Sequence, residues 1–338
     1  MNKVIPFVFL GSRLNATLRT SIVSLRFQTN CKMPPGSLKG QVALVTGASR
    51  GIGKGVAIEL GKAGCIVYIT GRDQTKSEGK FLHQKTSLEA VAEEINKSGG
   101  KGHAVFCDHS QPSDVKSLFE RIEKQEGKLN ILVNNAYAAV FYMLKNMGKK
   151  FYEVEDSPEH SYEVINNVGL KNNYICAVYA AKMMARQKSG LIVNISSVGS
   201  INYLFNVPYG FGKCALNRMS ADMAIELKDV NVNSISLVCG AVQTEVIGET
   251  ILKNKENEAA SYFVDGESIY FPGRAIAFLA QNEKILKEFN GCAVTTTQLM
   301  DKYGLKDVDG KAHRDKVIDK YAKHLENVNN VQLEALRK

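Results

Sequence analysis

The 338-residue chain lacks several patterns that would assign it to common classes of protein. No apolar run approaches the roughly 18 residues that a membrane-spanning helix requires. Its seven cysteines include no Cys-x-x-Cys pair, so we expect reduced core thiols rather than a disulfide framework or a zinc site. The six histidines have no metal-ligand spacing, and the sequence therefore predicts no metal centre.

Positive charge is concentrated at the start of the chain. The formal net charge is +9, and residues 1–32 carry five basic residues and no acidic one. The remaining chain therefore carries +4, which is ordinary for a protein of this size. No basic stripe with interleaved aromatic residues is present, so nucleic acid is not an expected partner.

Residues 1–32 have the composition of a cleavable targeting segment, because they are basic, free of acid and contain serine and threonine. The apolar run at 4–10 is short for a secretory signal, which favours a mitochondrial presequence. Alternatively, translation starts at Met33, directly before Pro34-Pro35-Gly36. The first hypothesis predicts a mitochondrial protein, and the second a cytoplasmic or endoplasmic-reticulum-associated one. In both, the fold begins near Gly40.

Apolar, β-rich runs alternate with helical stretches along the rest of the chain. Strands are predicted at 42–45, 66–70, 104–106, 131–133, 191–195 and 232–237, and helices near 52–63, 86–97, 113–125, 160–187 and 208–227. This alternation is typical of a parallel sheet covered on both faces. We therefore predict one α/β domain over residues 40–300, a Rossmann-like doubly wound sheet, followed by a helical extension at 301–338.

Two stretches interrupt the alternation, at 138–157 and 245–272. Both follow strands, so they should leave the sheet at its carboxyl end, where open α/β sheets bind ligands. They are predicted to form the walls of a substrate pocket, with surface insertions as the alternative.

A glycine-rich turn follows the first predicted strand and opens a helix. It reads Thr46-Gly47-Ala48-Ser49-Arg50-Gly51-Ile52-Gly53. Its glycines allow a tight turn and a close approach of a pyrophosphate, and the free amides of the helix start can bind the phosphates. The turn therefore predicts a dinucleotide cofactor.

The end of the second strand indicates which dinucleotide binds. A carboxylate at this point would select NAD by binding the ribose 2′-hydroxyl. Gly71 and Arg72 stand there instead, and Arg72 together with Arg50 could bind a 2′-phosphate. We therefore expect NADP(H) to be preferred over NAD(H). Asp73, one residue later, leaves ribose binding open as an alternative.

Polar residues follow the third and fourth strands. Asp108 comes after the third, and Asn134-Asn135-Ala136 closes the fourth. At such strand ends, side chains can contact adenine and ribose, so all four are candidate cofactor residues. Alternatively, Asn134 or Asn135 cross-links neighbouring strands.

Tyr209 and Lys213 are spaced by one helical turn and should share one face of a helix. A neighbouring cation favours the phenolate, so Lys213 is expected to lower the pKa of Tyr209 from its usual value near 10. The pair Ser196-Ser197 ends the strand before this helix, and a hydroxyl of one of these serines could hold a carbonyl or alcohol oxygen. This set predicts acid–base chemistry beside a hydride transfer.

Taken in order, the TGxxxGIG turn, the NNA tripeptide, the serine, the Tyr-x-x-x-Lys pair and a late Val-x-Thr resemble a short-chain dehydrogenase/reductase over about residues 40–250. Stretches at 166–170, 205–210, 242–245 and 303–310 are similar to one particular member of this family. The resemblance implies that Tyr209 is the general acid, that Lys213 lowers its pKa and binds the nicotinamide ribose, and that Ser197 positions the substrate. It also implies cofactor contacts from Ile52, Val242 and Thr244.

The chain departs from the family pattern at four places. Gly169 stands where the family has its fourth catalytic residue, an asparagine, and Tyr137 replaces a common glycine. Cys239 replaces the proline of a Pro-Gly turn, and the stretch 290–294 lacks the usual Val-Asp-Gly-Gly ending, so subunit contacts of any homo-oligomer would differ.

These features predict an NADPH-dependent reductase of ketones or aldehydes, and the resemblance suggests steroid and xenobiotic carbonyls. One alternative is reduction of 3-oxo or enoyl lipid chains, and another is a non-catalytic NADP(H)-binding sensor or scaffold. Apolar residues Val317, Tyr321 and Leu325 are helically spaced in a basic tail. The tail is predicted to be a solvated helix, with docking on a partner subunit or on a membrane surface as the alternative.

Overall fold

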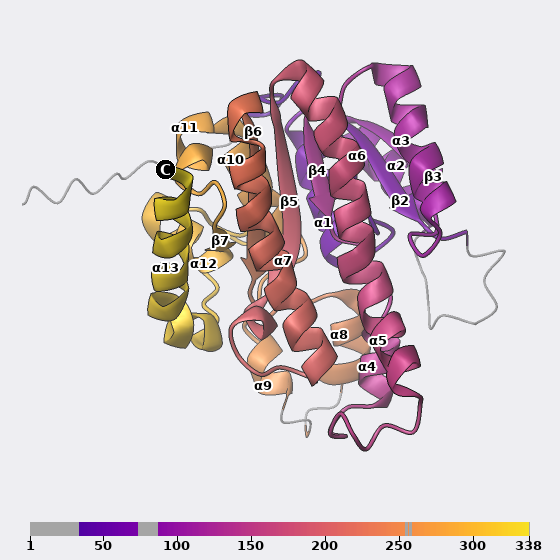
Figure 1. The fold of residues 1–338 in the computed structure, drawn as a ribbon, viewed down its shortest axis with the longest axis vertical. Coiled ribbons are helices and arrows are strands. Elements are labelled where there is room, and N and C mark those ends of the chain that lie inside the picture. Colours follow the sequence, from indigo (N-terminus) through magenta and orange to yellow (C-terminus); the bar gives the residue numbers. More distant parts are fainter. Residues whose placement is uncertain (1–33, 74–86, 254–255, 257–258, 338) are drawn as a thin grey trace, which may run out of the picture.

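The computed structural model describes residues 34–73, 87–253, 256 and 259–337. The segment 1–32, for which a presequence was one prediction, lies outside these residues. The described chain contains a seven-stranded, all-parallel sheet in the order β3-β2-β1-β4-β5-β6-β7 (Figure 1). Its strands are β1 (Val42–Val45), β2 (Ile66–Gly71), β3 (Lys101–Phe106), β4 (Ile131–Asn134), β5 (Gly190–Ser197), β6 (Val232–Cys239) and β7 (Ala293–Thr295). The predicted Rossmann-like α/β fold is confirmed.

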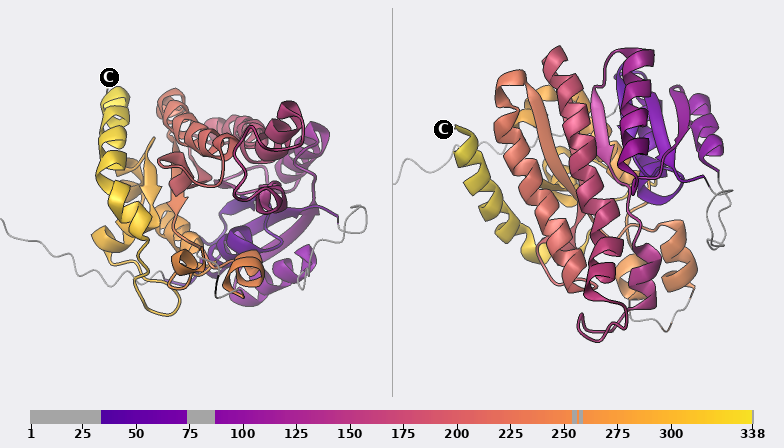
Figure 2. Two further views of the ribbon diagram at one scale, coloured as in Figure 1. Left: turned by 90° about the horizontal axis from the view of Figure 1, so that it is seen from below. Right: turned by 45° about the vertical axis from the view of Figure 1, so that its right-hand side comes forward.

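Helices lie on both sides of the sheet (Figure 2). They are α1 (Gly51–Lys62), α2 (Leu88–Ser98), α3 (Pro112–Glu126), α4 (Val140–Lys145), α5 (Pro158–Asn166), α6 (Asn172–Gln187), α7 (Val207–Glu226), α8 (Glu245–Ile247), α9 (Ala260–Phe263), α10 (Phe271–Gln281), α11 (Glu283–Glu288), α12 (Thr296–Tyr303) and α13 (Lys316–Arg337). Short helices α4, α8 and α9 gather at one end of the sheet, beside the end of α5 (Figure 1).

Burial on both faces explains why the strands are continuously apolar. In β1, Ala43 and Val45 pack into the core under α1, α2 and α10, whereas Val42 and Leu44 point to the opposite core under α3 and α6. Successive side chains of a strand face opposite sides of the sheet. In a strand covered by helices on both faces, every side chain is therefore buried, which favours apolar residues at every position.

The helix predicted over 160–187 is interrupted, and that prediction is wrong in this respect. A kinked segment, Asn167–Lys171, separates α5 from α6, with Gly169 at φ 143°. The side chains of Asn172 and Asn173 bond the backbone N–H and C=O of Gly169, at 2.6 and 3.1 Å. These bonds satisfy backbone groups that lose their helical partners at the break, so the side chains of Asn172 and Asn173 stabilise the kink.

The C-terminal helix α13 closes one edge of the sheet. Asn329 accepts a hydrogen bond from Ala293 N and donates one to Ala293 O, at 2.9 and 2.8 Å, as a neighbouring strand would. Ile318 and Leu325 are buried, and Tyr321 Oη donates to Asn202 at 2.9 Å. Packing inside the molecule thus accounts for the apolar spacing of the tail. In the described part of the chain, no helix has the length and apolarity needed to cross a membrane.

Candidate active site

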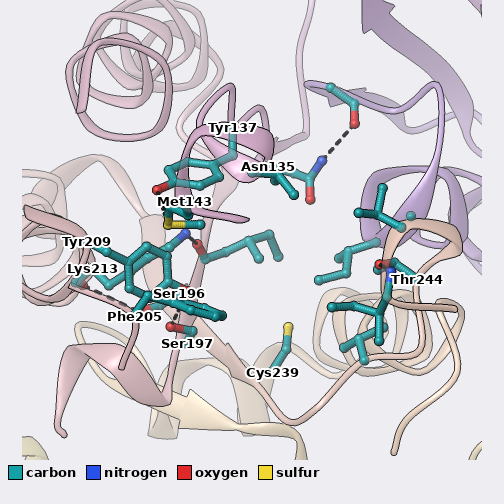
Figure 3. Close-up of a pocket in the computed structure, with 18 of the residues that line it drawn as sticks. Asn135, Tyr137, Met143, Ser196, Ser197, Phe205, Tyr209, Lys213, Cys239 and Thr244 are labelled. Atoms are coloured by element: carbon teal, nitrogen blue, oxygen red, sulfur yellow. Dashed lines mark hydrogen bonds between the residues drawn. The ribbon is translucent and has the colours of Figure 1, made fainter. Parts of the chain in front are cut away.

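A cavity of about 780 Å³ lies at the carboxyl ends of the strands. Met143 and Met147 line it from the first stretch that interrupts the alternation of strands and helices, and Ile251 and Tyr262 line it from the second. Both stretches therefore wall the cavity, as the sequence predicted. Figure 3 shows side chains from the loop after β4, from α4, β5 and α7, and from the segment after β6 converging on it.

Tyr209 is held in the first turn of α7 by local sequence features. Asn206 precedes the helix, and its side chain accepts a hydrogen bond from Tyr209 N at 2.9 Å, while Pro208 occupies the first turn. The phenol donates to Ser197 Oγ at 2.7 Å (Figure 3). Ser196 instead directs its hydroxyl to the backbone carbonyl of Lys213, at 3.4 Å. The geometry thus couples Ser197, rather than Ser196, to the phenol.

Lys213 lies one turn after Tyr209 and reaches the same cavity. Its ammonium donates to Ile195 O at 2.9 Å and lies 5.8 Å from the centroid of the Tyr209 ring. Removal from bulk water lowers the pKa of Lys213 to about 8. Ser197, Tyr209 and Lys213 are therefore brought together although β5 and α7 are separated in sequence.

The pKa of Tyr209 moves in the opposite direction to the prediction. Burial raises it to about 12, and the hydrogen bond with Ser197 offsets only part of this effect. The expectation that this pKa is lowered is not met, because desolvation of the phenolate is the largest influence on it and only the hydrogen bond with Ser197 opposes that influence. Tyr209 consequently holds its proton at neutral pH, as a general acid must.

The glycine turn between β1 and α1 is fixed by the end of β4. Asn135 Nδ2 donates to Thr46 O and Gly47 O, both at 2.9 Å, and Thr46 Oγ1 accepts from Asn135 N and Ala136 N. A Cβ on Gly53 would lie 2.4 Å from Asn135 Nδ2 and 2.5 Å from Gly47 O. The turn therefore requires glycine at 53 because of close packing.

Most of the predicted cofactor residues line the cavity. They are Gly47, Ser49, Arg50, Gly51, Ile52, Arg72, Asp108, Asn135, Ala136, Tyr209, Lys213, Val242 and Thr244. Gly53 and Asn134 are not among the lining residues, and Asn134 instead donates to Asn173 O and Asn194 Oδ1 at 3.1 and 3.0 Å. Asn134 therefore cross-links β4, β5 and α6, which is the structural alternative considered above.

Charge at the glycine turn is balanced by neighbouring groups. The guanidinium of Arg50 lies 5.3 Å from the centroid of the Phe141 ring. Burial lowers its pKa, the nearby carboxylate of Glu245 opposes this effect, and Arg72 adds to it. Gly51 N donates to Glu245 Oε2 at 2.9 Å. Arg50 and Arg72 are therefore close enough to interact, on the side of the cavity formed by the turn.

Sequence reasoning missed Glu267, a buried carboxyl group that anchors the segment after β6. Its side chain accepts from Gly240 N at 3.2 Å and from Thr296 Oγ1, and its backbone pairs with Ala241 and Gln243. Burial raises the pKa of Glu267 to about 8. No motif marks this residue, but it holds in place the turn in which Cys239 replaces proline.

His109 is the second residue that sequence reasoning missed. It is buried, bonds Thr70 Oγ1 through Nε2 at 2.8 Å, and lines the cavity beside Asp108. Burial lowers its pKa to about 4, so it is neutral at pH 7. Among the described residues, no group of three histidine, cysteine, aspartate or glutamate side chains has metal-binding geometry.

Comparison with known proteins identifies the fold and the family. The family model for short chain dehydrogenases matches residues 41–255. The chain belongs to the short-chain dehydrogenase/reductase family. It is 44% identical over 285 residues to dehydrogenase/reductase SDR family member 1 of Mus musculus, covering 82% of this chain and 86% of that protein. The Homo sapiens protein of the same name is 43% identical with the same coverage.

These relatives confirm the resemblance seen in the motifs. A solved short-chain type dehydrogenase/reductase from Mycobacterium marinum shares the fold, with a TM-score of 0.62 at 24% identity, over 76% of this chain and 94% of that chain. As a short-chain dehydrogenase/reductase, this chain is an NAD(P)-dependent oxidoreductase acting on CH–OH or carbonyl groups.

The residues of the turn fit such a cofactor. Gly47 and Gly51 have φ of 65° and 57°, in the left-handed region that glycine favours. A Cβ on Gly51 would lie 3.4 Å from the Thr244 side chain, so a larger residue would fill the space between the turn and the segment after β6. Both glycines line the cavity, where the amide of Gly51 is held by Glu245, so a pyrophosphate at the helix start would have to displace this carboxylate.

Proposed function

We propose that this short-chain dehydrogenase/reductase reduces ketones or aldehydes with NADPH. The supporting observation is the 2.7 Å hydrogen bond from Tyr209 Oη to Ser197 Oγ inside the cavity, with Lys213 one helical turn away. The nicotinamide cofactor, when bound, supplies the hydride for reduction or accepts it in the reverse oxidation. The protein's contribution is to hold the carbonyl and to move the proton.

Each of the three residues has a separate role in the proposed reduction. Ser197 binds the carbonyl oxygen of the substrate through its own hydroxyl. Tyr209 transfers its proton to that oxygen as negative charge develops on it. Lys213, with a pKa of about 8, carries a positive charge at neutral pH and stabilises the phenolate that Tyr209 becomes.

Preference for NADPH is proposed from the two arginines beside the glycine turn. Arg50 and Arg72 both line the cavity and are near enough to interact electrostatically. A 2′-phosphate between two guanidinium groups would form charge-assisted hydrogen bonds and relieve their mutual repulsion. NAD lacks this phosphate, so it would leave the repulsion in place.

Glu245 is expected to oppose cofactor binding, because its carboxylate holds the Gly51 amide at the start of α1. A phosphate at the same helix start would be repelled by this exposed negative charge. We predict that Glu245→Gln tightens NADPH binding by about 3- to 10-fold, measured by titrating the cofactor's fluorescence. Glu249→Gln, four residues further on, is the matched control. Unchanged or weaker binding in Glu245→Gln would contradict the prediction.

The cavity favours an apolar substrate of considerable size. Met143, Met147, Leu204, Ile251 and Phe263 are among its lining side chains. Apolar lining with a few polar groups near the reacting atoms is typical of small-molecule sites. Steroid ketones and bulky xenobiotic carbonyls fit this description, and so do lipid chains that carry a 3-oxo group.

A carbonyl screen tests the proposal directly. Purified protein is assayed for NADPH and NADH consumption with steroid ketones, aromatic ketones, aldehydes, 3-oxoacyl and enoyl thioesters. We expect turnover with ketones or aldehydes, and kcat/KM at least about 10-fold higher with NADPH than with NADH. Turnover of thioesters alone would favour a lipid-chain reductase. Tight NADPH binding without consumption across the panel would favour a sensor or scaffold.

A further inference from the structure

Tyr137, in the loop after β4, packs directly against the kink between α5 and α6. A Cβ on Gly169 would lie 2.4 Å from Cδ2 and 2.7 Å from Cε2 of the Tyr137 ring. The neighbouring backbone is also joined, because Ala138 N donates to Val168 O at 3.3 Å. The ring therefore occupies the space that any side chain at position 169 would need. Tyr137 can take this position only because residue 169 is glycine.

The same ring faces the ammonium of Lys213. Lys213 Nζ lies 5.1 Å from the centroid of the Tyr137 ring and 5.8 Å from that of Tyr209. The two rings meet edge to face, with centroids 6.0 Å apart and planes at 73°. Figure 3 shows Tyr137, Tyr209 and Lys213 on one side of the cavity. Distances below about 6 Å from a ring centroid are those of cation–π contacts.

No acidic side chain of the described chain pairs with Lys213. The groups around its ammonium are the carbonyl of Ile195 on β5, the phenol of Tyr209 on α7, the thiol of Cys239 on β6 and the Tyr137 ring. Burial raises the pKa values of Tyr209, Cys239 and Tyr137, so all three are neutral at pH 7. Aromatic faces and one carbonyl therefore provide the negative potential that a partly desolvated cation requires.

We propose that Tyr137 is a positioning residue, whose ring, seated on Gly169, keeps the Lys213 ammonium charged and directed into the cavity. The proposal deepens the reductase function proposed above and rests on it. The Tyr137 hydroxyl is not needed for this role, since its hydrogen-bond partner is Met143 Sδ, at 3.4 Å, and not Lys213. The face of the ring stabilises the charged lysine, so phenylalanine at position 137 should stabilise it as well as tyrosine does.

Substitution of Tyr137 tests the proposal through the pH dependence of reduction. Without the ring, the charged form of Lys213 loses stabilisation, so its proton dissociates at lower pH. In Tyr137→Leu, the alkaline limb of kcat/KM should therefore move down by about 0.5 to 1.5 pH units. Tyr137→Phe retains the ring and should keep the wild-type limb. Tyr137→Met is a second ring-free variant of similar volume, used if the leucine variant fails to fold.

A second readout separates this proposal from the reductase function. Competitive acetylation of Lys213 with acetic anhydride across pH, followed by mass spectrometry, reports the pKa of its amine without any substrate. The same downward shift is expected in Tyr137→Leu and not in Tyr137→Phe. If the wild type reduces no carbonyl, only the proposed function fails. If the labelling pKa is the same in all variants, or if Tyr137→Leu changes KM alone, the ring only shapes the cavity and the proposal is overturned.

Discussion

Tyr209→Phe is expected to lower kcat for carbonyl reduction by about 10²- to 10⁴-fold, the usual contribution of a general acid. The substitution removes only the hydroxyl that donates to Ser197. The ring contacts with Phe205 and Tyr137, at centroid distances of 5.1 and 6.0 Å, remain available. Because the proton donor is lost while packing is retained, the defect should be confined to turnover.

Single-turnover and steady-state rates, with NADPH affinity measured alongside, check this prediction. Tyr142→Phe is the matched control, since it removes a phenol hydroxyl bonded to Ser161 at 2.7 Å, and neither of these residues lines the cavity. This control should have wild-type kcat. A Tyr209→Phe protein with a near-wild-type rate would show that the proton comes from another group. Loss of NADPH affinity in the same variant would indicate damage to the fold rather than to the chemistry.

Arg72→Ala is expected to reduce the preference for NADPH over NADH by about 10- to 100-fold, the range of a hydrogen bond between charged groups. Arg72 lies at the end of β2 beside Arg50, so the remaining guanidinium should retain part of the preference. The double variant Arg50→Ala/Arg72→Ala should lose more, because both partners of the 2′-phosphate are then absent.

The ratio of kcat/KM values for the two cofactors measures the effect. Values with NADH should change little, since NADH carries no 2′-phosphate. Arg186→Ala is the control, because Arg186 pairs with Glu123 at 2.7 Å on the surface. An equal fall with both cofactors would instead assign Arg72 a structural role, and an unchanged ratio would favour the ribose-binding alternative offered by Asp73.

Much of the fold could be predicted from the pattern of apolar residues within single short segments of the chain. Continuous apolar runs predicted six strands, and the strand at 42–45 was placed without error. The kink at Gly169 could not be found in this way, because the apolar spacing of a helix continues on both sides of the break. The bend became evident only from the local bonds of Asn172 and Asn173 to Gly169 and from the contact of Tyr137, which is made across the fold.

The candidate residues themselves were also accessible from spacing and residue type. The glycine turn, Arg72, Ser197, Tyr209 and Lys213 stand at strand ends and helix starts, and parallel topology collects such positions at one edge. The effect of burial on the pKa values of these residues could not be predicted from the sequence. A cation one turn away suggested a lowered phenol pKa, yet burial raises the pKa of Tyr209 to about 12.

Residue order thus predicted the parallel α/β sheet, the dinucleotide turn and the Ser-Tyr-Lys set, because short patterns of residues mark each strand, the turn and the Tyr-x-x-x-Lys pair even where folding joins distant segments. Three properties arose only in the folded chain: the protonation of Tyr209 and Lys213, the anchoring of Gly240 by Glu267, and the contact of Tyr137 with Gly169 and Lys213. Desolvation and close packing depend on contacts between groups distant in sequence, and the local sequence pattern does not show these contacts.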